Sequence, residues 1–207
     1  MKDFSKISID YQKEAKQIIC SEDEEAKYLY NIRSGTVRIS KMLSDGRRQI
    51  TGFLFAGDFF GLSCKDRYNF TAEAVTNVDI CRFPRTKIMQ SFRDYPNLGE
   101  RVFDMTRTEL DSTHDQMLLL GRKTAQEKLC SFLLAMKEKL GRLEVVAENE
   151  VDIPMSRTDI ADYLGLTVET ISRQFTKLHK KGLIEMEGAH KVFLKDIKAL
   201  SALAIGD

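Results

Sequence analysis

Apolar positions follow two different periods along the chain, and the change between them falls near Pro84. Between residues 28 and 83, short segments alternate apolar and polar residues, as in TVRI at 36–39, which is the period of a half-buried strand. An Asp-Gly pair at 45–46 and a Gly-Asp pair at 57–58 separate such segments, and glycine tolerates the positive φ angles of tight turns. Many short strands at this spacing predict an antiparallel barrel or roll.

After Pro84 the period is that of helices, with a short helix expected over 84–96 and a long one over 97–121. Six residues of the long helix are spaced alternately by three and four positions, which is a heptad seam: Phe103, Thr106, Leu110, Thr113, Met117 and Leu120. The seam contains no acid or base, so a second copy could pack on it without burying an unpaired charge. We therefore expect a homodimer. The alternative is that this seam and a neighbouring stripe of Val102, Met105 and Leu119 both face one core within the chain.

A further amphipathic helix is expected over 121–142, with Leu129, Phe132, Leu133 and Met136 facing inward. The segment that follows, 143–155, is acidic. No Gly/Ser-rich linker separates the two halves of the chain, so the joint between them is expected around 121–142, within helical sequence.

Residues 156–178, SRTDIADYLGLTVETISRQFTKL, contain two short helical patterns separated by a glycine. Ser156 and Asp159 have the spacing of a capping box, and Gly165 can take the left-handed conformation that ends a helix. Thr167 can cap the second helix. The inward residues of the two helices are Ile160, Ala161, Leu164, Val168, Ile171, Phe175 and Leu178. Two short helices around a glycine turn, the second with a polar outer face, predict a helix-turn-helix.

The polar face of the second helix carries Glu169, Ser172 and Arg173 at positions i, i+3 and i+4. Arginine can bond guanine O6 and N7 together, glutamate can accept from cytosine N4, and serine suits either base. We therefore predict that these three residues contact DNA bases. Alternatively, Glu169 and Arg173 form an ion pair on a solvated surface.

A net charge of +1 does not itself point to a polyanionic partner, so the position of the charges matters. Residues 167–182 carry four bases and one acid. Residues 122–142 carry two acids and six bases, which are Arg122, Lys123, Lys128, Lys137, Lys139 and Arg142. We expect phosphate contacts from these basic segments. The residues predicted to contact the DNA backbone are Ser156, Arg157, Thr167, Thr170, Thr176, Lys177, Lys180 and Lys191.

Residues 182–196 predict two strands with Gly188 at the turn, which would be the wing of a winged helix, and 197–204 predict a short closing helix. His190 near this turn is expected to lie in solvent or near phosphate, and no metal site is expected. The chain would thus comprise a β-roll domain at 1–96, a dimerisation helix at 97–121 and a DNA-binding domain at 122–207.

These motifs together resemble the CRP/FNR family of bacterial transcription regulators over about residues 28–205. The recognition helix is similar to that of the FNR and FixK branch, which carries E-x-x-S-R, here Glu169, Ser172 and Arg173. MLSDGRRQI at 42–50 is also similar to FixK-type hairpins. The resemblance implies an α+β fold with an antiparallel β-roll of the cyclic-nucleotide-binding type, a long dimerisation helix and a C-terminal winged helix-turn-helix. It further implies a palindromic site similar to TTGAT-N4-ATCAA, activation with RNA polymerase as a partner, and control of low-oxygen or respiratory genes.

Departures from the family pattern bear on the effector. Members that bind cyclic AMP hold its phosphate with Gly-Glu and Arg-Ser/Thr pairs, whereas Asp58 and Phe70-Thr71 stand at those places here. A phosphate without its arginine is poorly held, so cyclic nucleotide binding is not expected. Val168 stands where the cyclic-AMP branch has arginine, which favours DNA specificity of the FNR type.

The oxygen-sensing FNR branch needs an N-terminal cysteine cluster, and only Cys20 is present in that region. No histidine precedes His114, which lies beside the seam, so haem held by a histidine is not expected, and an axial ligand from Cys, Met or the backbone stays open. We therefore expect a FixK-like regulator with no obligatory cofactor.

Two alternatives remain open for its control. An unidentified small molecule could bind the roll and gate DNA binding, or the thiols of Cys64, Cys81 and Cys130 could respond to oxidation, although such scattered cysteines are also typical of buried core positions. An enzyme is not expected, because no nucleophile–base motif, phosphate loop or metal-ligand spacing is present. No apolar run of about 18 residues and no secretory apolar segment occur, so we expect a cytoplasmic protein without membrane spans.

Overall fold

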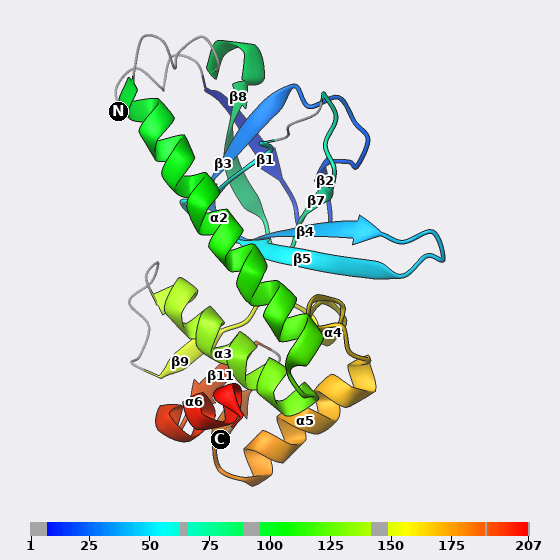
Figure 1. Ribbon diagram of the computed structural model, residues 1–207, viewed down its shortest axis with the longest axis vertical. Helices are drawn as coiled ribbons and strands as arrows, with labels where there is room; N and C mark the ends of the chain where they lie inside the picture. Colours follow the sequence, from blue (N-terminus) through cyan, green and yellow to red (C-terminus); the bar gives the residue numbers. More distant parts are fainter. Residues whose placement is uncertain (1–7, 63–65, 89–95, 142–148, 189, 207) are drawn as a thin grey trace. The chain divides into compact units, whose positions relative to one another are not determined.

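The computed structural model describes residues 8–62, 66–88, 96–141, 149–188 and 190–206. It consists of two compact units, Met1–His114 and Asp115–Asp207, and the boundary between them falls inside the long helix α2 (Pro96–Arg122) (Figure 1). The predicted division into three domains remains a proposal.

The first unit contains the antiparallel roll that the short strands predict. One sheet has the strand order β1-β8-β3-β6 and the other β2-β7-β4-β5. The strands are β1 (Ile9–Lys13), β2 (Ile18–Cys20), β3 (Tyr28–Ser34), β4 (Val37–Met42), β5 (Arg48–Leu54), β6 (Phe59–Phe60), β7 (Thr71–Ala74) and β8 (Val78–Pro84). Of the helix expected over 84–96, residue 84 instead ends β8 and residues 85–88 form a helical turn. Residues 89–95 lie outside the described residues, and residue 96 begins α2.

The hairpin between β4 and β5 turns at the predicted Asp-Gly pair. Gly46 has φ +85°, a conformation that side chains other than glycine rarely adopt, and Leu43 N–H donates to Arg47 C=O over 2.8 Å. The alternation predicted at 36–39 ends at a bulge between Ile39 and Ser40, which shifts the register. Val37 is buried and Ile39, half-buried, packs against the same core, and Ser40 beyond the bulge is buried as well.

Helix α2 extends the predicted long helix by one residue at each end. Phe103, Leu110 and Met117, one heptad apart, are 64%, 55% and 66% exposed. The hydroxyls of Thr106 and Thr113 donate to carbonyls one turn earlier in the helix. The single chain thus leaves most of the seam uncovered, which contradicts the alternative that both apolar stripes lie in one intrachain core.

The second unit begins within α2 and continues through a helical layer and a small sheet of order β10-β11-β9. Its further elements are α3 (Ala125–Gly141), β9 (Glu150–Asp152), α4 (Arg157–Leu164), α5 (Val168–Lys180), β10 (Ile184–Glu187), β11 (Lys191–Leu194) and α6 (Ile197–Ile205). Helix α3 is the centre of the unit and packs against α5, α6 and β9. Its buried side chains include the four that the sequence predicts, Leu129, Phe132, Leu133 and Met136.

Strand β9 was not predicted, because three residues with one inward side chain, Val151, show no period. It pairs with β11 and so adds a third strand to the predicted wing. None of the helices in the described part of the chain is both long and apolar enough to cross a membrane.

Candidate nucleic-acid interface

The first helix of the predicted helix-turn-helix, α4, starts at the expected capping box. Ser156 Oγ accepts from Asp159 N–H over 3.1 Å, and a carboxylate oxygen of Asp159 accepts from Ser156 N–H over 3.2 Å. At its other end Gly165 has φ +61°, and its N–H donates to Ala161 C=O. Ile160, Ala161 and Leu164 are buried, so the predicted boundaries and inward face of α4 are confirmed.

Helix α5 follows with Thr167 as its N-cap, since Thr167 Oγ1 accepts from Thr170 N–H over 3.2 Å. Three of the four predicted inward residues, Ile171, Phe175 and Leu178, are fully or nearly fully buried. Val168, at the first turn, is half-buried. One apolar stripe of α5 therefore packs against the rest of the unit, and the opposite face of the helix is exposed to solvent.

Glu169, Ser172 and Arg173 are all exposed on that outer face, as the spacing predicts. Hydrogen bonds from its own backbone N–H and from the Thr167 hydroxyl hold the pKa of the Glu169 carboxyl below its usual value. Arg173 Nη2 instead donates to Thr170 Oγ1 over 3.3 Å. Within the described helix no ion pair joins Glu169 to Arg173, so the alternative that they only neutralise each other is wrong.

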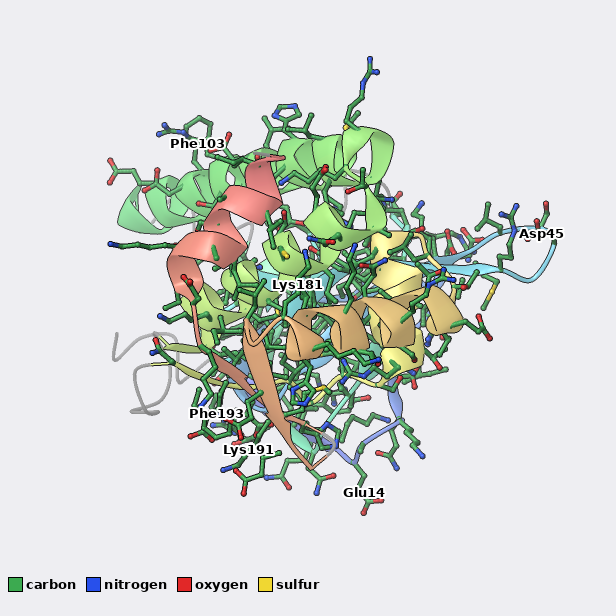
Figure 2. The ribbon with its side chains drawn as sticks, turned by 90° about the horizontal axis from the view of Figure 1, so that it is seen from below. Glu14, Asp45, Phe103, Lys181, Lys191 and Phe193 are labelled. Carbon is green, nitrogen blue, oxygen red and sulfur yellow. The ribbon has the colours of Figure 1, made fainter. Side chains whose placement is uncertain are left out.

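Beyond this triad, α5 becomes strongly basic. Arg173, Thr176, Lys177, Lys180 and Lys181 line an open hollow, and Figure 2 shows Lys181 at the end of the helix. The Thr176 hydroxyl donates to Ser172 C=O, whereas the three lysines have no ion pair with any residue that the structure describes. Unpaired ammonium groups beside a potential base-reading face suit the phosphates of a polyanion.

Two of the charged residues predicted to contact the DNA backbone are already engaged within the protein. The Arg157 guanidinium lies 3.3 Å from the centroid of the Phe175 ring and its Nη2 is 3.4 Å from Met186 Sδ, and burial lowers its pKa. Lys191 Nζ, on the wing strand β11 (Figure 2), pairs with Glu150 over 2.9 Å, which raises the pKa of Lys191. Whether either group reaches DNA remains a proposal.

In the basic segment 122–142, two lysines do not have the role in phosphate binding that the sequence predicts. Lys128 is only 7% exposed and its Nζ donates to Leu164 C=O over 3.1 Å. Lys123 Nζ donates to Ser131 Oγ over 2.7 Å and to Ala204 C=O over 2.9 Å. These two ammonium groups bind helix ends within the unit, so a phosphate role for Lys128 in particular is wrong; Arg142 lies outside the described residues.

The wing and closing helix form as predicted. Gly188 has φ +65° between β10 and β11, and α6 follows with Asp196 as its N-cap. His190 Nδ1 lies 2.9 Å from Ile153 C=O. Among the described residues no group of three or more His, Cys, Asp or Glu side chains could hold a metal.

Two domain families match this chain. Residues 127–203 match the Crp-like helix-turn-helix domain, and residues 12–95 match the cyclic nucleotide-binding domain. The transcriptional activatory protein AadR of Rhodopseudomonas palustris is 43% identical over 189 residues, which cover 90% of this chain and 79% of AadR. The nitrogen fixation regulation protein FixK of Bradyrhizobium diazoefficiens is 44% identical over 168 residues, covering 81% of this chain and 70% of FixK.

The structure of FixK2 from Bradyrhizobium japonicum superposes on this one with a TM-score of 0.88 and 36% identity, covering 95% of this chain and 97% of FixK2. The sheets, long helix and winged helix-turn-helix described above therefore belong to a known architecture of regulators, and the prediction that the chain is not an enzyme is confirmed. With both domains matched and relatives above 40% identity along most of its length, the chain belongs to the CRP/FNR family of transcription regulators, among its FixK-like members.

Proposed function

We propose that this regulator is a homodimeric activator that binds a palindrome similar to TTGAT-N4-ATCAA. The observation that carries the proposal is the exposed Glu169, Ser172 and Arg173 triad on α5, whose side chains have the donors and acceptors that base edges require. AadR is named a transcriptional activatory protein and FixK a nitrogen fixation regulation protein. Activation through contact with RNA polymerase, in low-oxygen or respiratory gene control, is the corresponding role for this chain.

The exposed stripe of α2 supports the dimer. Phe103, Leu110 and Met117 together present large apolar side chains on one helix face, which a second copy of α2 would remove from water. A two-fold dimer presents two recognition helices to successive turns of the major groove, as a palindrome demands.

The interior of the roll supports activity without an obligatory cofactor, because aromatic and aliphatic side chains pack together in it. Tyr30 and Phe60 stack with ring centroids 4.8 Å apart, and Tyr68, 1% exposed, lies 6.3 Å from Tyr30. The Tyr68 hydroxyl donates to Tyr28 C=O over 2.7 Å and accepts from Tyr28 N–H over 3.1 Å. An interior packed in this way needs no ligand to complete its core.

Fluorescence anisotropy with a duplex containing TTGAT-N4-ATCAA, against a scrambled duplex, tests the proposal. Reduced protein freed of metals and small molecules is expected to bind the palindrome at least about 10³-fold more tightly than the scrambled duplex. Equal affinity for both duplexes would contradict the proposed site. If added cell metabolites then restored specific binding, the ligand-gated alternative would replace cofactor independence.

Burial of Cys130, one of the three candidate thiols, weakens the alternative of control by oxidation. Desolvation raises the pKa of Cys20 to about 12 and that of Cys130 to about 11, and both side chains are buried. Cys81 is half-buried, and Cys64 lies outside the described residues.

We expect Cys20 and Cys130 to resist iodoacetamide at pH 8 in the folded protein. A pKa of about 12 in place of 9.0 leaves Cys20 roughly a thousandfold less thiolate, which is the reactive species. Mass spectrometry of labelled peptides checks this, with protein unfolded in guanidinium as the control in which both residues react. Labelling of Cys130 in the folded protein at the unfolded rate would return it to the list of candidate sensors.

A further inference from the structure

The C-terminal end of α4 is held by two side chains from outside the helix-turn-helix. Gln116 Nε2, on α2, donates to Tyr163 C=O over 2.9 Å, and Lys128 Nζ, on α3, donates to Leu164 C=O over 3.1 Å. Tyr163 and Leu164 are the last two residues of α4. Carbonyls in the last turn of a helix lack partners in the helix itself, and a cation there meets the negative end of the helix dipole.

Lys128 is an unusual choice for its position. It is 7% exposed and lies beside Leu129 on the inward side of α3, where an apolar side chain would avoid the cost of burying a charge. Its ammonium group forms no ion pair with a carboxylate that the structure describes, and it is too buried to contact a DNA phosphate. The contact it does make is with the end of α4, so its contribution is to the placement of that end.

The turn that follows is short and closely packed. Gly165 has φ +61°, and a Cβ at this position would stand 3.3 Å from Leu120 Cδ2 of α2. Only Leu166 separates Gly165 from Thr167, the N-cap of α5. Because two residues leave little room to absorb a rotation of α4, the position of the Leu164 carbonyl constrains the start of the recognition helix, whose buried stripe packs on α3 and α4.

We infer that Gln116 and Lys128 are positioning residues that fix the recognition helix relative to α2 and α3 without touching DNA. The inference rests on the proposed function and deepens it. Gln116 lies directly before Met117 of the exposed stripe on α2. The helix proposed to dimerise would therefore also orient the base-reading face, so that both half-sites are read in register.

The variants that test this are Lys128→Met and Gln116→Met, which remove the donor and keep the length of the Gln116 side chain and all but the last atom of the Lys128 chain. Lys198→Met is the matched control, since Lys198 is an exposed lysine of α6 outside the interface. Affinities for the palindromic and scrambled duplexes, their salt dependence, and the melting temperature are measured for each dimer.

Lys128→Met is expected to lower affinity for the palindrome roughly tenfold while leaving the scrambled duplex and the salt slope unchanged, because it loses no phosphate contact. Its melting temperature is expected to stay about level, since the desolvation cost of the buried ammonium group and the hydrogen bond to Leu164 C=O are lost together. Combining it with Gln116→Met is expected to cost less than the product of the two single effects, because both act on one helix end. An unchanged ratio of specific to non-specific affinity, or a parallel loss of both with a lower melting temperature, would overturn the inference.

Hydrogen exchange of the amides at residues 164–168 provides a readout that needs no DNA. Their exchange is expected to quicken by about tenfold in Lys128→Met and to stay unchanged in Lys198→Met. If the wild-type protein failed to prefer the palindrome, the proposed function would be contradicted. The exchange measurement would still test the role of Lys128, because it needs no DNA. Equal exchange in Lys128→Met and wild type would contradict the positioning role.

Discussion

Glutamate in place of Leu110 is expected to convert the dimer into monomers and to remove tight binding to the palindrome. Leu110 lies at the middle of the exposed stripe on α2, one heptad from Phe103 and Met117. In a two-fold dimer the substitution faces its own copy, so two carboxylates would be buried together with no cation in the seam. At roughly 3 kcal/mol or more for each unpaired buried charge, the dimer dissociation constant rises by about 10⁴-fold.

Sedimentation velocity of Leu110→Glu gives the state of association, and anisotropy gives the consequence for DNA. A monomer contacts only one half-site, so binding to the palindrome is expected to weaken by about 10²-fold or more, because the two DNA-binding domains are no longer linked. Thr108→Glu adds the same charge on the opposite, exposed face of α2 and is expected to leave the dimer intact. A Leu110→Glu protein that sedimented as a dimer would show that the stripe is not the seam.

Local signals in the sequence predicted much of the fold. The Asp-Gly turn at 45–46, the capping box at Ser156 and the glycine at 165 each specify a backbone geometry through their own chemistry, and each appears where expected. The bulge at Ile39 and Ser40 could not be predicted in this way. Its register depends on the partner strands β5 and β7, which lie far away along the chain.

The candidate site shows the same limit for charged residues. The spacing of Glu169 and Arg173 placed them on one face correctly, but an i, i+4 ion pair was also consistent with it. The contacts to Thr167 and Thr170 contradict that ion pair, and contact with bases stays a prediction. In the sequence, Lys128 is among the bases of a segment expected to contact phosphate. A lysine can extend its amine toward solvent or toward a helix end, and the position of Leu164 relative to α3 is a tertiary property.

Removing the guanidinium of Arg173 is expected to cost about 1–3 kcal/mol of specific binding, which is roughly 5- to 150-fold in affinity. Arg173 is exposed at the base-reading face, and its Nη2 is 3.3 Å from Thr170 Oγ1, a neutral contact that a stronger acceptor can replace. A guanidinium binds guanine O6 and N7 in one plane. The proposed half-site TTGAT holds a single G·C pair, so base preference is expected to relax there and to persist at the A·T positions.

Anisotropy with the palindrome and with duplexes changed at each half-site position measures this. Arg173→Lys keeps the charge but cannot form the planar pair of hydrogen bonds, so it is expected to lose specificity almost as Arg173→Ala does. Lys180→Ala, an exposed lysine of the same helix, is expected to weaken all duplexes alike and to reduce the salt slope by about 1. If Arg173→Ala behaved as Lys180→Ala does and Arg173→Lys restored binding, Arg173 would be a phosphate contact. The reading of the G·C pair would then fall to Glu169, whose carboxylate can accept from cytosine N4 in that same pair.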